Sequence, residues 1–294
     1  MPPIVLVTGG AGSMGRLVVA RLVGLGMSVR AFDLPSVNFT GLEGKPGVEI
    51  ARGDLTRPED LASAVKGIDA VVHLAAVLPP VADRNPALTE KVNVVGTRAL
   101  VGAVFAGAPR ARFVFSSSVS VYGDTTSARP GQRGITVDQP AAPDDVYARS
   151  KADSERLVRE SPLDWVVLRI SGVAVPAFQE PPAAWPFLAD QRVEFVHRDD
   201  AVSAIVAAVD ASAKPRVVYN VAGGQDWRMT GRDYAGDYLE LVGVERGEAA
   251  YQSSPGHFDW YETSTSQAAL RYQDTPYRTY LSQIRAELER LMGQ

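Results

Sequence analysis

Two residues near the middle of the chain, Tyr147 and Lys151, have the spacing and the chemistry of an acid–base pair. They are four residues apart in a stretch, 144–159, whose pattern predicts a helix, so both side chains would lie on one helix face. A free phenol has a pKa of about 10 and is a poor base at neutral pH. Because a neighbouring ammonium favours the phenolate, the pair could move a proton to or from a substrate oxygen.

A run of three serines, Ser116, Ser117 and Ser118, ends an apolar stretch that predicts a strand over residues 112–116. The end of such a strand places hydroxyls at the carboxyl edge of a sheet, where one of them could donate a hydrogen bond to a carbonyl oxygen. The alternative is that an individual serine serves only in a turn or a cap. The residues alone leave the choice among the three open.

A glycine-rich turn follows the first apolar stretch and leads directly into a helical pattern. Its three key glycines are spaced by three residues: the first permits a tight turn, the second lets the backbone approach a pyrophosphate, and the third lets helix and strand pack closely. The helix start would offer free N–H groups to the phosphates, so the turn predicts a dinucleotide site; the alternative is a structural loop. The residues of this predicted site are Gly9, Gly12, Ser13, Met14 and Gly15.

Two carboxylates follow the next two apolar stretches. Asp33 lies eighteen residues after Gly15, where a carboxylate would accept hydrogen bonds from an adenosine ribose and repel a 2′-phosphate. No Lys or Arg occurs from residue 34 to 44, so NAD is favoured over NADP as the cofactor. Asp54 and Leu55 could meet the edge and the face of the adenine, although Asp54 could equally cap the next segment.

Short apolar stretches alternate with longer helical patterns, as in βαβ units that form a parallel sheet. We therefore predict an α/β protein with a Rossmann-type doubly wound parallel sheet and a small C-terminal substrate-binding region. Residues 1–170 would bind NAD and 171–294 the substrate, with 195–223 returning to the Rossmann sheet. Strands are expected at 4–8, 28–32, 48–51, 70–75, 112–116, 165–170 and 217–221, and helices at 14–25, 58–65, 89–106, 144–159 and 280–292.

The composition argues against several other classes of protein. The 30 Lys and Arg residues nearly balance 34 Asp and Glu, and the net charge of −4 indicates no basic surface for nucleic acid or an anionic membrane. With no cysteine and three histidines far apart in sequence, we expect no disulfide and no metal site. The chain has no apolar stretch of about 18 residues and no signal-like N-terminus, so a cytoplasmic enzyme is expected.

Two loops, 123–143 and 175–186, are rich in proline and follow predicted strands, so either could lie at the ligand-binding edge or be a plain surface linker. The last helix has an apolar stripe on one face, which predicts core packing. The residues of this stripe are Leu281, Ile284, Leu288 and Leu291.

Taken together, these motifs resemble the extended short-chain dehydrogenase/reductases, the NAD-dependent epimerase/dehydratase family. The resemblance covers residues 4 to about 223, in family order, and its motifs are specific as a set. It is carried by TGGAGSMG from Thr8, Asp33, Asp54-Leu55, HLAA from His73, VNVVGT from Val92, FSSSVSVYG from Phe115, YARSK from Tyr147, Leu168-Arg169, FVHRDD from Phe195, YNVAG from Tyr219 and the later segment 259–267.

The resemblance implies Ser118 as the catalytic serine, Tyr147 as the acid/base and Lys151 as the residue that modulates it and holds the nicotinamide ribose. It implies a packed core role for His73 and an organising role around the sixth strand for His197. The residues that it puts along the cofactor or beside the site are Leu74, Ala75, Ala76, Asn93 and Ser116, with Tyr147 and Lys151.

Two departures from the family pattern narrow the substrate. The Asp-Glu pair that performs elimination in nucleotide-sugar dehydratases is replaced here by Val119 and Ser120, so that reaction is not expected. The Asn that follows Leu-Arg in nucleotide-sugar epimerases is absent, and the substrate segment is short. The resemblance therefore suggests a smaller or less charged substrate, such as a free sugar, a uronate or a hydroxyl/keto compound. The expected substrate-binding residues are Val77, Leu78, Ser118, Tyr147 and the loop 175–186.

Three hypotheses follow for the function. The first is a reversible NAD-dependent alcohol/ketone oxidoreductase, and the second is a nucleotide-sugar epimerase that re-reduces its own transient 4-keto intermediate. The third is a non-catalytic NAD-binding sensor, which would need the glycine turn but not the Ser–Tyr–Lys set. Family members often pair through helices that correspond to 89–106 and 144–159, so the resemblance also implies a homodimer.

Overall fold

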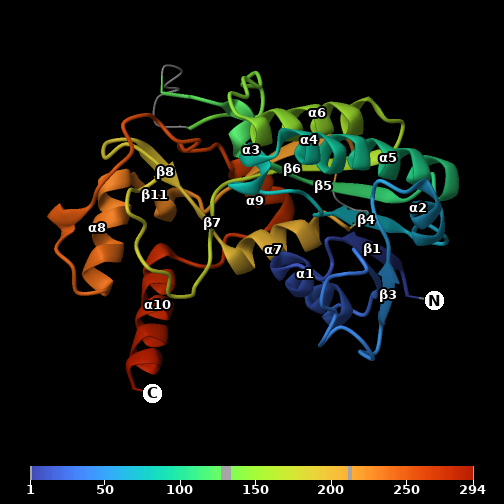
Figure 1. Cartoon of the computed structure of the whole chain (residues 1–294), viewed down its shortest axis with the longest axis horizontal. Coiled ribbons are helices and arrows are strands. Elements are labelled where there is room, and N and C mark those ends of the chain that lie inside the picture. Colours follow the sequence, from blue (N-terminus) through green and yellow to red (C-terminus); the bar gives the residue numbers. More distant parts are fainter. Residues whose placement is uncertain (1, 127–133, 211–213, 294) are drawn as a thin grey trace.

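The computed structural model describes residues 2–126, 134–210 and 214–293. Within these ranges seven parallel strands form one sheet in the order β3-β2-β1-β4-β5-β6-β10 (Figure 1). This order confirms the predicted doubly wound Rossmann-type sheet, whose order reverses between β1 and β4. The strands are β1 (Ile4–Thr8), β2 (Ser28–Asp33), β3 (Val48–Arg52), β4 (Ala70–His73), β5 (Arg112–Ser118), β6 (Asp164–Ile170) and β10 (Val217–Val221).

The central strands are apolar because both faces of the sheet are covered. In β1, Val5 and Val7 face one hydrophobic core and Leu6 faces the other, and all three side chains are fully buried. Burying one such side chain stabilises the fold by about 1.5–3 kcal/mol. The predicted strand bounds are correct to within two residues, and the main differences are that β4 ends early and β5 continues to Ser118.

Helices cover the two faces in separate layers (Figure 1). The helices α1 (Ser13–Gly24) and α7 (Arg198–Ala207) pack together on one face. On the other face lie α2 (Pro58–Ala64), α5 (Gly96–Gly107) and α6 (Val146–Glu160). The expected helices at 14–25, 58–65 and 144–159 are therefore confirmed with small shifts at their ends.

The helix expected over 89–106 is instead broken into three pieces. These are α4 (Pro86–Thr89), a π-helix η1 (Glu90–Val95) and α5. The hydroxyls of Thr97 and Ser154 both donate to the carbonyl oxygen of Asn93. Side-chain hydroxyls that donate to a carbonyl oxygen of the helix compete with its backbone hydrogen bonds, which is a known cause of a widened turn. Such π-helical turns are frequent at functional sites.

The C-terminal region has its own core, which is largely aromatic. The helices α8 (Gly231–Leu241) and α10 (Tyr277–Met292) and the antiparallel strands β8 (Arg192–Glu194) and β11 (Arg228–Thr230) lie beside one end of the sheet (Figure 1). The sequence predicted a single strand after residue 199, so β11 corrects that expectation. The aromatic side chains buried in this core are Trp185, Phe187, Trp227, Tyr234, Tyr238, Tyr277 and Tyr280.

The apolar stripe predicted on the last helix is only partly buried in the core. Ile284 is fully buried, but Leu291 is exposed, because the C-terminal end of α10 extends past the core. Tyr277 and Tyr280, in the first turn of the helix, are buried in its place. The helix thus begins three residues before the expected position and uses tyrosines to pack against α8.

Several short elements complete the described chain. They are α3 (Val81–Arg84), η2 (Val119–Tyr122), β7 (Val173–Ala174), β9 (Val196–His197), η4 (Gln225–Trp227), η5 (Arg246–Glu248) and α9 (Ser264–Leu270). Strand β10 pairs with β6, so residues 217–221 join the main sheet, whereas β9 pairs with β7 in a separate two-stranded sheet. Among the described residues, no helix combines the length and the apolar character needed to cross a lipid bilayer.

Candidate active site

A hollow of about 680 Å³ opens at the carboxyl edge of the sheet, where β1 and β4 diverge. This is the position at which doubly wound sheets bind ligands, because neighbouring loops there turn to opposite faces. The hollow extends from the glycine-rich turn after β1 to the end of β5 and the start of α6. The sequence-predicted residues that line it are Gly9, Gly12, Ser13, Met14, Gly15, Asp33, Asp54, Leu55, Leu74, Ala75, Ala76, Val77, Leu78, Ser116, Ser118, Tyr147 and Lys151.

The glycine-rich turn has the geometry that a pyrophosphate site needs. Gly9 has φ +70°, and a Cβ there would lie 2.9 Å from the backbone nitrogen of Ala75. A Cβ on Gly15 would lie 2.0 Å from the carbonyl oxygen of Gly9, so only glycine lets α1 pack this close to the turn. At Gly12 the nearest atom to such a Cβ is Gly9 O at 3.2 Å, so its outer side is free for a ligand.

Two carboxylates lie at the far end of the hollow from Tyr147. Asp33 Oδ2 accepts a hydrogen bond from Ala11 N at 3.0 Å, and Oδ1 accepts one from Leu34 N at 2.9 Å. Asp54 Oδ1 accepts from both the backbone and the hydroxyl of Thr56, and these bonds lower its pKa. Asp54 therefore holds the turn before α2 and also lines the hollow, and its contact with the adenine stays a prediction.

The structure places Asn93 behind the hollow instead of in its wall, which corrects the expected cofactor contact. Its side-chain oxygen accepts from Val77 N at 2.7 Å, and its nitrogen donates to Val77 O at 3.1 Å and to Ser150 Oγ at 2.9 Å. All of these groups belong to the protein, and Asn93 is buried. Its side chain therefore anchors the loop after β4, which forms one wall of the hollow, to α6.

Ser118, Tyr147 and Lys151 meet at one end of the hollow. The Ser118 hydroxyl is close enough to the Tyr147 phenol to lower the pKa of that phenol, and Ser118 Oγ also accepts a hydrogen bond from Ser120 N at 3.1 Å. Lys151 Nζ donates to Ser116 O at 2.8 Å and lies 5.8 Å from the centre of the Tyr147 ring. Asp145 caps α6 by accepting from Ala148 N at 2.6 Å, so the helix start that carries Tyr147 is held in place.

Burial controls the protonation of this pair in the free protein. It raises the pKa of the Tyr147 phenol, and the Ser118 hydrogen bond opposes the shift. Burial lowers the pKa of Lys151 to about 8, although the nearby Glu155 carboxylate opposes that change. At neutral pH the free protein therefore holds a neutral phenol beside an ammonium, and added positive charge nearby would favour loss of the phenol proton.

The other serines of the run have different partners. Ser117 also lines the hollow, but its Oγ donates to the buried Glu155 Oε1 at 2.6 Å. Glu155 also pairs with Arg169 at 2.8 Å, and both side chains are buried. Ser116 contributes its carbonyl oxygen to Lys151. The structure therefore selects Ser118 as the hydroxyl that faces Tyr147, a choice that the residues alone left open.

The wall opposite the glycine turn differs from the sequence expectation. No residue of the loop 175–186, all of which is described, lines the hollow. Trp185 is buried in the C-terminal core, and the loop borders a separate cavity of about 120 Å³ beside Tyr234 and Tyr280. Residues that the sequence did not single out also line the hollow, among them Leu88, Lys91, Ser171 and Val173. No local motif marks them, because they come from two segments that are far apart in the chain, 88–91 and 171–173.

The two buried histidines have structural partners. His73 is hydrogen-bonded to Thr8 Oγ1 at 2.7 Å and Thr97 Oγ1 at 2.8 Å, and burial lowers its pKa to about 3. His197 accepts from Asp199 N at the start of α7 and contacts Gln283 on α10 at 2.9 Å. Both positions agree with the structural roles expected for them.

Of the proline-rich loop 123–143, residues 127–133 lie outside the described residues.

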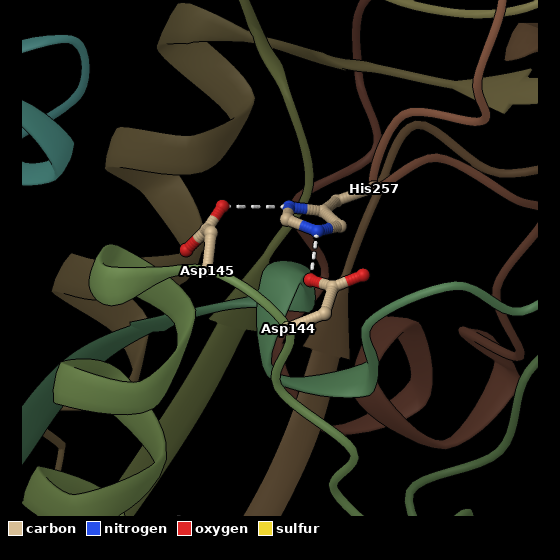
Figure 2. A group of neighbouring side chains, drawn as sticks. All are labelled: Asp144, Asp145 and His257. Atoms are coloured by element: carbon tan, nitrogen blue, oxygen red, sulfur yellow. Dashed lines mark hydrogen bonds and ion pairs between the residues drawn. The ribbon is translucent and has the colours of Figure 1, made fainter.

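His257, by contrast, lies between two carboxylates at the start of α6 (Figure 2). Its Nε2 is 2.5 Å from Asp144 and its Nδ1 is 3.4 Å from Asp145. One ligand atom from each residue lies within 4.8 Å of the others, a spacing that a metal ion could also use. The contacts present are those of a hydrogen-bonded clamp that ties the C-terminal region to α6, and the absence of a metal site stays a prediction.

The chain is similar to known proteins in both sequence and structure. The chain spans about half the length of the curated relatives it matches. The 3 beta-hydroxysteroid dehydrogenase/Delta 5→4-isomerase of Mycobacterium tuberculosis is 36% identical over 160 residues, which cover 52% of this chain and 41% of that protein.

Solved structures extend the similarity over nearly the whole chain. A short-chain dehydrogenase/reductase superfamily protein from Agrobacterium tumefaciens with bound NAD has a TM-score of 0.80 at 24% identity, covering 99% of this chain and 98% of that one. MoeE5 in complex with UDP-glucuronic acid and NAD has a TM-score of 0.78 at 26% identity, covering 98% and 99%. A sequence model of the NAD dependent epimerase/dehydratase family matches residues 5–183, more than half of the chain. With the fold, the turn and this match in agreement, the chain belongs to the NAD dependent epimerase/dehydratase family.

Proposed function

We propose that this protein is an NAD-dependent oxidoreductase that interconverts a secondary alcohol and a ketone. The observation that carries the proposal is the meeting of Ser118, Tyr147 and Lys151 at one end of a hollow whose other end has a pyrophosphate turn. The residues fit NAD: the glycine turn would hold the pyrophosphate, Asp33 the adenosine ribose and Lys151 the second ribose. NAD, when bound, accepts or returns a hydride.

The protein's own residues supply the acid–base chemistry in this proposal. Ser118 donates a hydrogen bond to the substrate oxygen, and Tyr147 removes the hydroxyl proton during oxidation or returns it during reduction. Lys151 keeps its charge close to the phenol and so favours the phenolate. A dehydratase reaction is not supported, because the two positions after Ser118 are Val119 and Ser120, and neither can act as a carboxylate acid or base.

The relatives support a dehydrogenase over the other hypotheses. The M. tuberculosis relative is named for a hydroxysteroid dehydrogenase activity. MoeE5, which is seen with UDP-glucuronic acid and NAD, shows that a nucleotide sugar also binds beside NAD in this fold. The epimerase hypothesis therefore remains the second candidate, and net cofactor turnover separates the two. A dehydrogenase produces one NADH per alcohol oxidised, whereas an epimerase returns the hydride to its own intermediate.

The proposal is tested with Tyr147→Phe. The variant keeps the ring but loses the proton that moves, so kcat for NADH formation should fall by about 10²–10⁴-fold. The affinity for NAD, measured by calorimetry, should stay nearly unchanged. A non-catalytic sensor would instead show no NADH formation with any alcohol in either form, and its ligand response would survive the substitution.

We further propose that the protein acts as a homodimer in the cytoplasm, where a dehydrogenase finds the enzymes that recycle its cofactor. The helices η1 and α5 carry exposed apolar side chains, Val95 and Phe105, beside the polar helix α6. Exposed apolar groups on neighbouring helices are typical of a contact between copies. Light scattering of the purified protein and of Phe105→Asp tests this: the wild type should be a dimer, and the variant should shift toward a monomer.

A further inference from the structure

The substrate end of the hollow has an apolar wall that water can reach. Leu78, Leu88 and Val173 all line the hollow, yet 56%, 38% and 37% of their surfaces are exposed. They come from three separate segments, so their meeting here is a property of the fold. A contiguous apolar surface at the mouth of a pocket is typical of a site that binds an apolar ligand.

The cations that line the hollow lie elsewhere or are already in use. Among the described lining residues they are Lys91 and Lys151. Lys91 is close enough to Asp54 to lower the pKa of that carboxyl, which places it toward the cofactor end. Lys151 is buried and donates to Ser116 O. A phosphate or carboxylate on the substrate would therefore meet no free guanidinium or ammonium from the described lining residues at this end.

Carboxylates, instead, surround the start of α6. Asp83 accepts a hydrogen bond from Tyr147 N at 3.3 Å. Asp145 is near enough to raise the pKa of the Tyr147 phenol, and Asp144 lies beside it, with His257 between the two. These acids do not line the hollow, and they offer an anionic substrate no favourable contact near Tyr147. The electrostatics and the apolar wall thus point to the same kind of ligand.

One neutral hydroxyl supplements Ser118 and Tyr147 at this end. Ser171 lines the hollow, is 4% exposed, and its Oγ has no hydrogen-bond partner. A buried hydroxyl without a partner costs free energy that a ligand oxygen or nitrogen can recover. A sugar, with a hydroxyl on most of its carbons, would need many more partners than these three side chains provide, whereas an alicyclic alcohol would need few.

We propose that the substrate is an uncharged secondary alcohol, or its ketone, carried on an apolar alicyclic body that rests on Leu78, Leu88 and Val173. This inference rests on the proposed oxidoreductase function and names the substrate class of the same site. It narrows the range of substrates expected from the sequence, which included free sugars and uronates. The alcohol oxygen meets Ser118 and Tyr147, and the buried Ser171 hydroxyl is a further neutral polar group at this end.

The test compares five compounds with the full-length protein and NAD: a decalinol, a 3-hydroxysteroid, a neutral hexose, a hexuronate and UDP-glucose. We expect kcat/KM for at least one of the two apolar alcohols to exceed that for each polar compound by about 100-fold or more. Equal or faster oxidation of the hexose, the uronate or UDP-glucose would overturn the substrate class and leave the oxidoreductase function intact.

A second measurement separates binding from chemistry. Calorimetry with the protein–NADH complex, in which an alcohol cannot be oxidised, gives the affinity for each compound. If no compound forms NADH, the oxidoreductase proposal fails, and the order of these affinities still decides the substrate class. Tighter binding of the apolar alcohols supports the inference, and tighter binding of the polar compounds overturns it.

Leu88→Lys tests the wall itself. Its side chain is partly exposed, so the substitution should leave the fold intact, and we expect KM and Kd for the apolar alcohol to rise about ten-fold or more with little change in kcat. The matched control is Leu25→Lys, since Leu25 is 60% exposed at the end of α1, away from the hollow. Equal effects of both substitutions, or no effect of either, would contradict the proposed role of the wall.

Discussion

The two ends of the hollow are built in different ways. The cofactor end uses backbone groups of a glycine turn and two carboxylates, Asp33 and Asp54, each tied to its own neighbours. The substrate end combines the exposed side chains Leu88 and Val173 with a buried hydroxyl, and these come from separate parts of the chain. The first end depends on local geometry, and the second on how the fold brings distant segments together.

This difference indicates which features of the chain would determine specificity for the cofactor and which would determine specificity for the substrate. A pyrophosphate is recognised by N–H groups whose positions depend on a few consecutive residues, so the turn needs glycines at fixed spacing. An apolar substrate is recognised by the shape and the absence of charge of a surface, which many side chains can provide. The cofactor end should therefore tolerate few substitutions, and the substrate end should change its preference gradually.

Gly15→Ala should have the largest effect, because the new Cβ would lie 2.0 Å from Gly9 O. We expect a loss of stability at or above the upper part of the range of about 1–3 kcal/mol for overpacking, and NAD affinity about 100-fold lower. Thermal unfolding and calorimetry measure the two. The control is Gly24→Ala in the same helix, where no atom lies within 4 Å and stability should rise by about 0.5–1 kcal/mol. Unchanged NAD binding in the first variant would contradict the pyrophosphate role.

Asp33→Asn should have the next largest effect, on the choice of cofactor. Removal of the negative charge ends the repulsion of a 2′-phosphate, so the preference for NAD over NADP should fall by about 10–100-fold. Affinities for the two dinucleotides measure this, and Asp54→Asn serves as a matched control that should keep the preference. If Asp33→Asn retains the full preference for NAD, another residue sets it.

A smaller effect is expected from the titration of Lys151, whose pKa burial lowers to about 8. The ammonium donates more strongly than the neutral amine, so affinity for NADH should be highest below pH 8 and fall about five-fold as pH rises through 8. Calorimetry from pH 6.5 to 9.5 checks this. Lys151→Met should give weaker binding with no inflection, and an inflection that persists in this variant would assign it to another group.

The smallest effect should come from His257→Ala at the clamp in Figure 2. The three side chains are partly exposed, so breaking the clamp should reduce the free energy of unfolding by about 1 kcal/mol or less. Denaturant unfolding measures this, with Arg232→Ala as the control, because the pair of Arg232 with Asp190 is more exposed. A large loss of stability would mean that the clamp supports much more than the start of α6.

Much of the fold and of the lining of the hollow could be predicted from the sequence. The strand bounds, the glycine turn, Asp33 and the Tyr147–Lys151 pair are each defined by residues close together in the chain, where periodicity and spacing act directly. The family match confirms NAD as the family's cofactor. The strands and the positions of these residues along the hollow were predictable because local geometry and sequence spacing carry the same information, whereas the roles of Asp33, Tyr147 and Lys151 stay predictions.

The errors share a different cause. Asn93 was expected beside the cofactor. In the folded chain its side chain instead forms hydrogen bonds with Val77 and Ser150. The aromatic loop 175–186 lies after a strand, yet a separate aromatic core buries Trp185. Residues 89–106 have a continuous helical pattern, and tertiary hydroxyl contacts to Asn93 accompany the π-helix that interrupts it. In each case a contact from a distant segment decided the outcome.

The sequence by itself determined the sheet, the glycine-rich turn and the helix that carries Tyr147 and Lys151, because each depends on residue types at short, fixed spacing. Only the tertiary structure decided that Ser118 is the serine near Tyr147 and that Leu78, Leu88 and Val173 line the same hollow. Both depend on side chains from separate strands, loops and helices that meet at one sheet edge. Their directions follow from strand register and packing, which no short stretch of sequence contains.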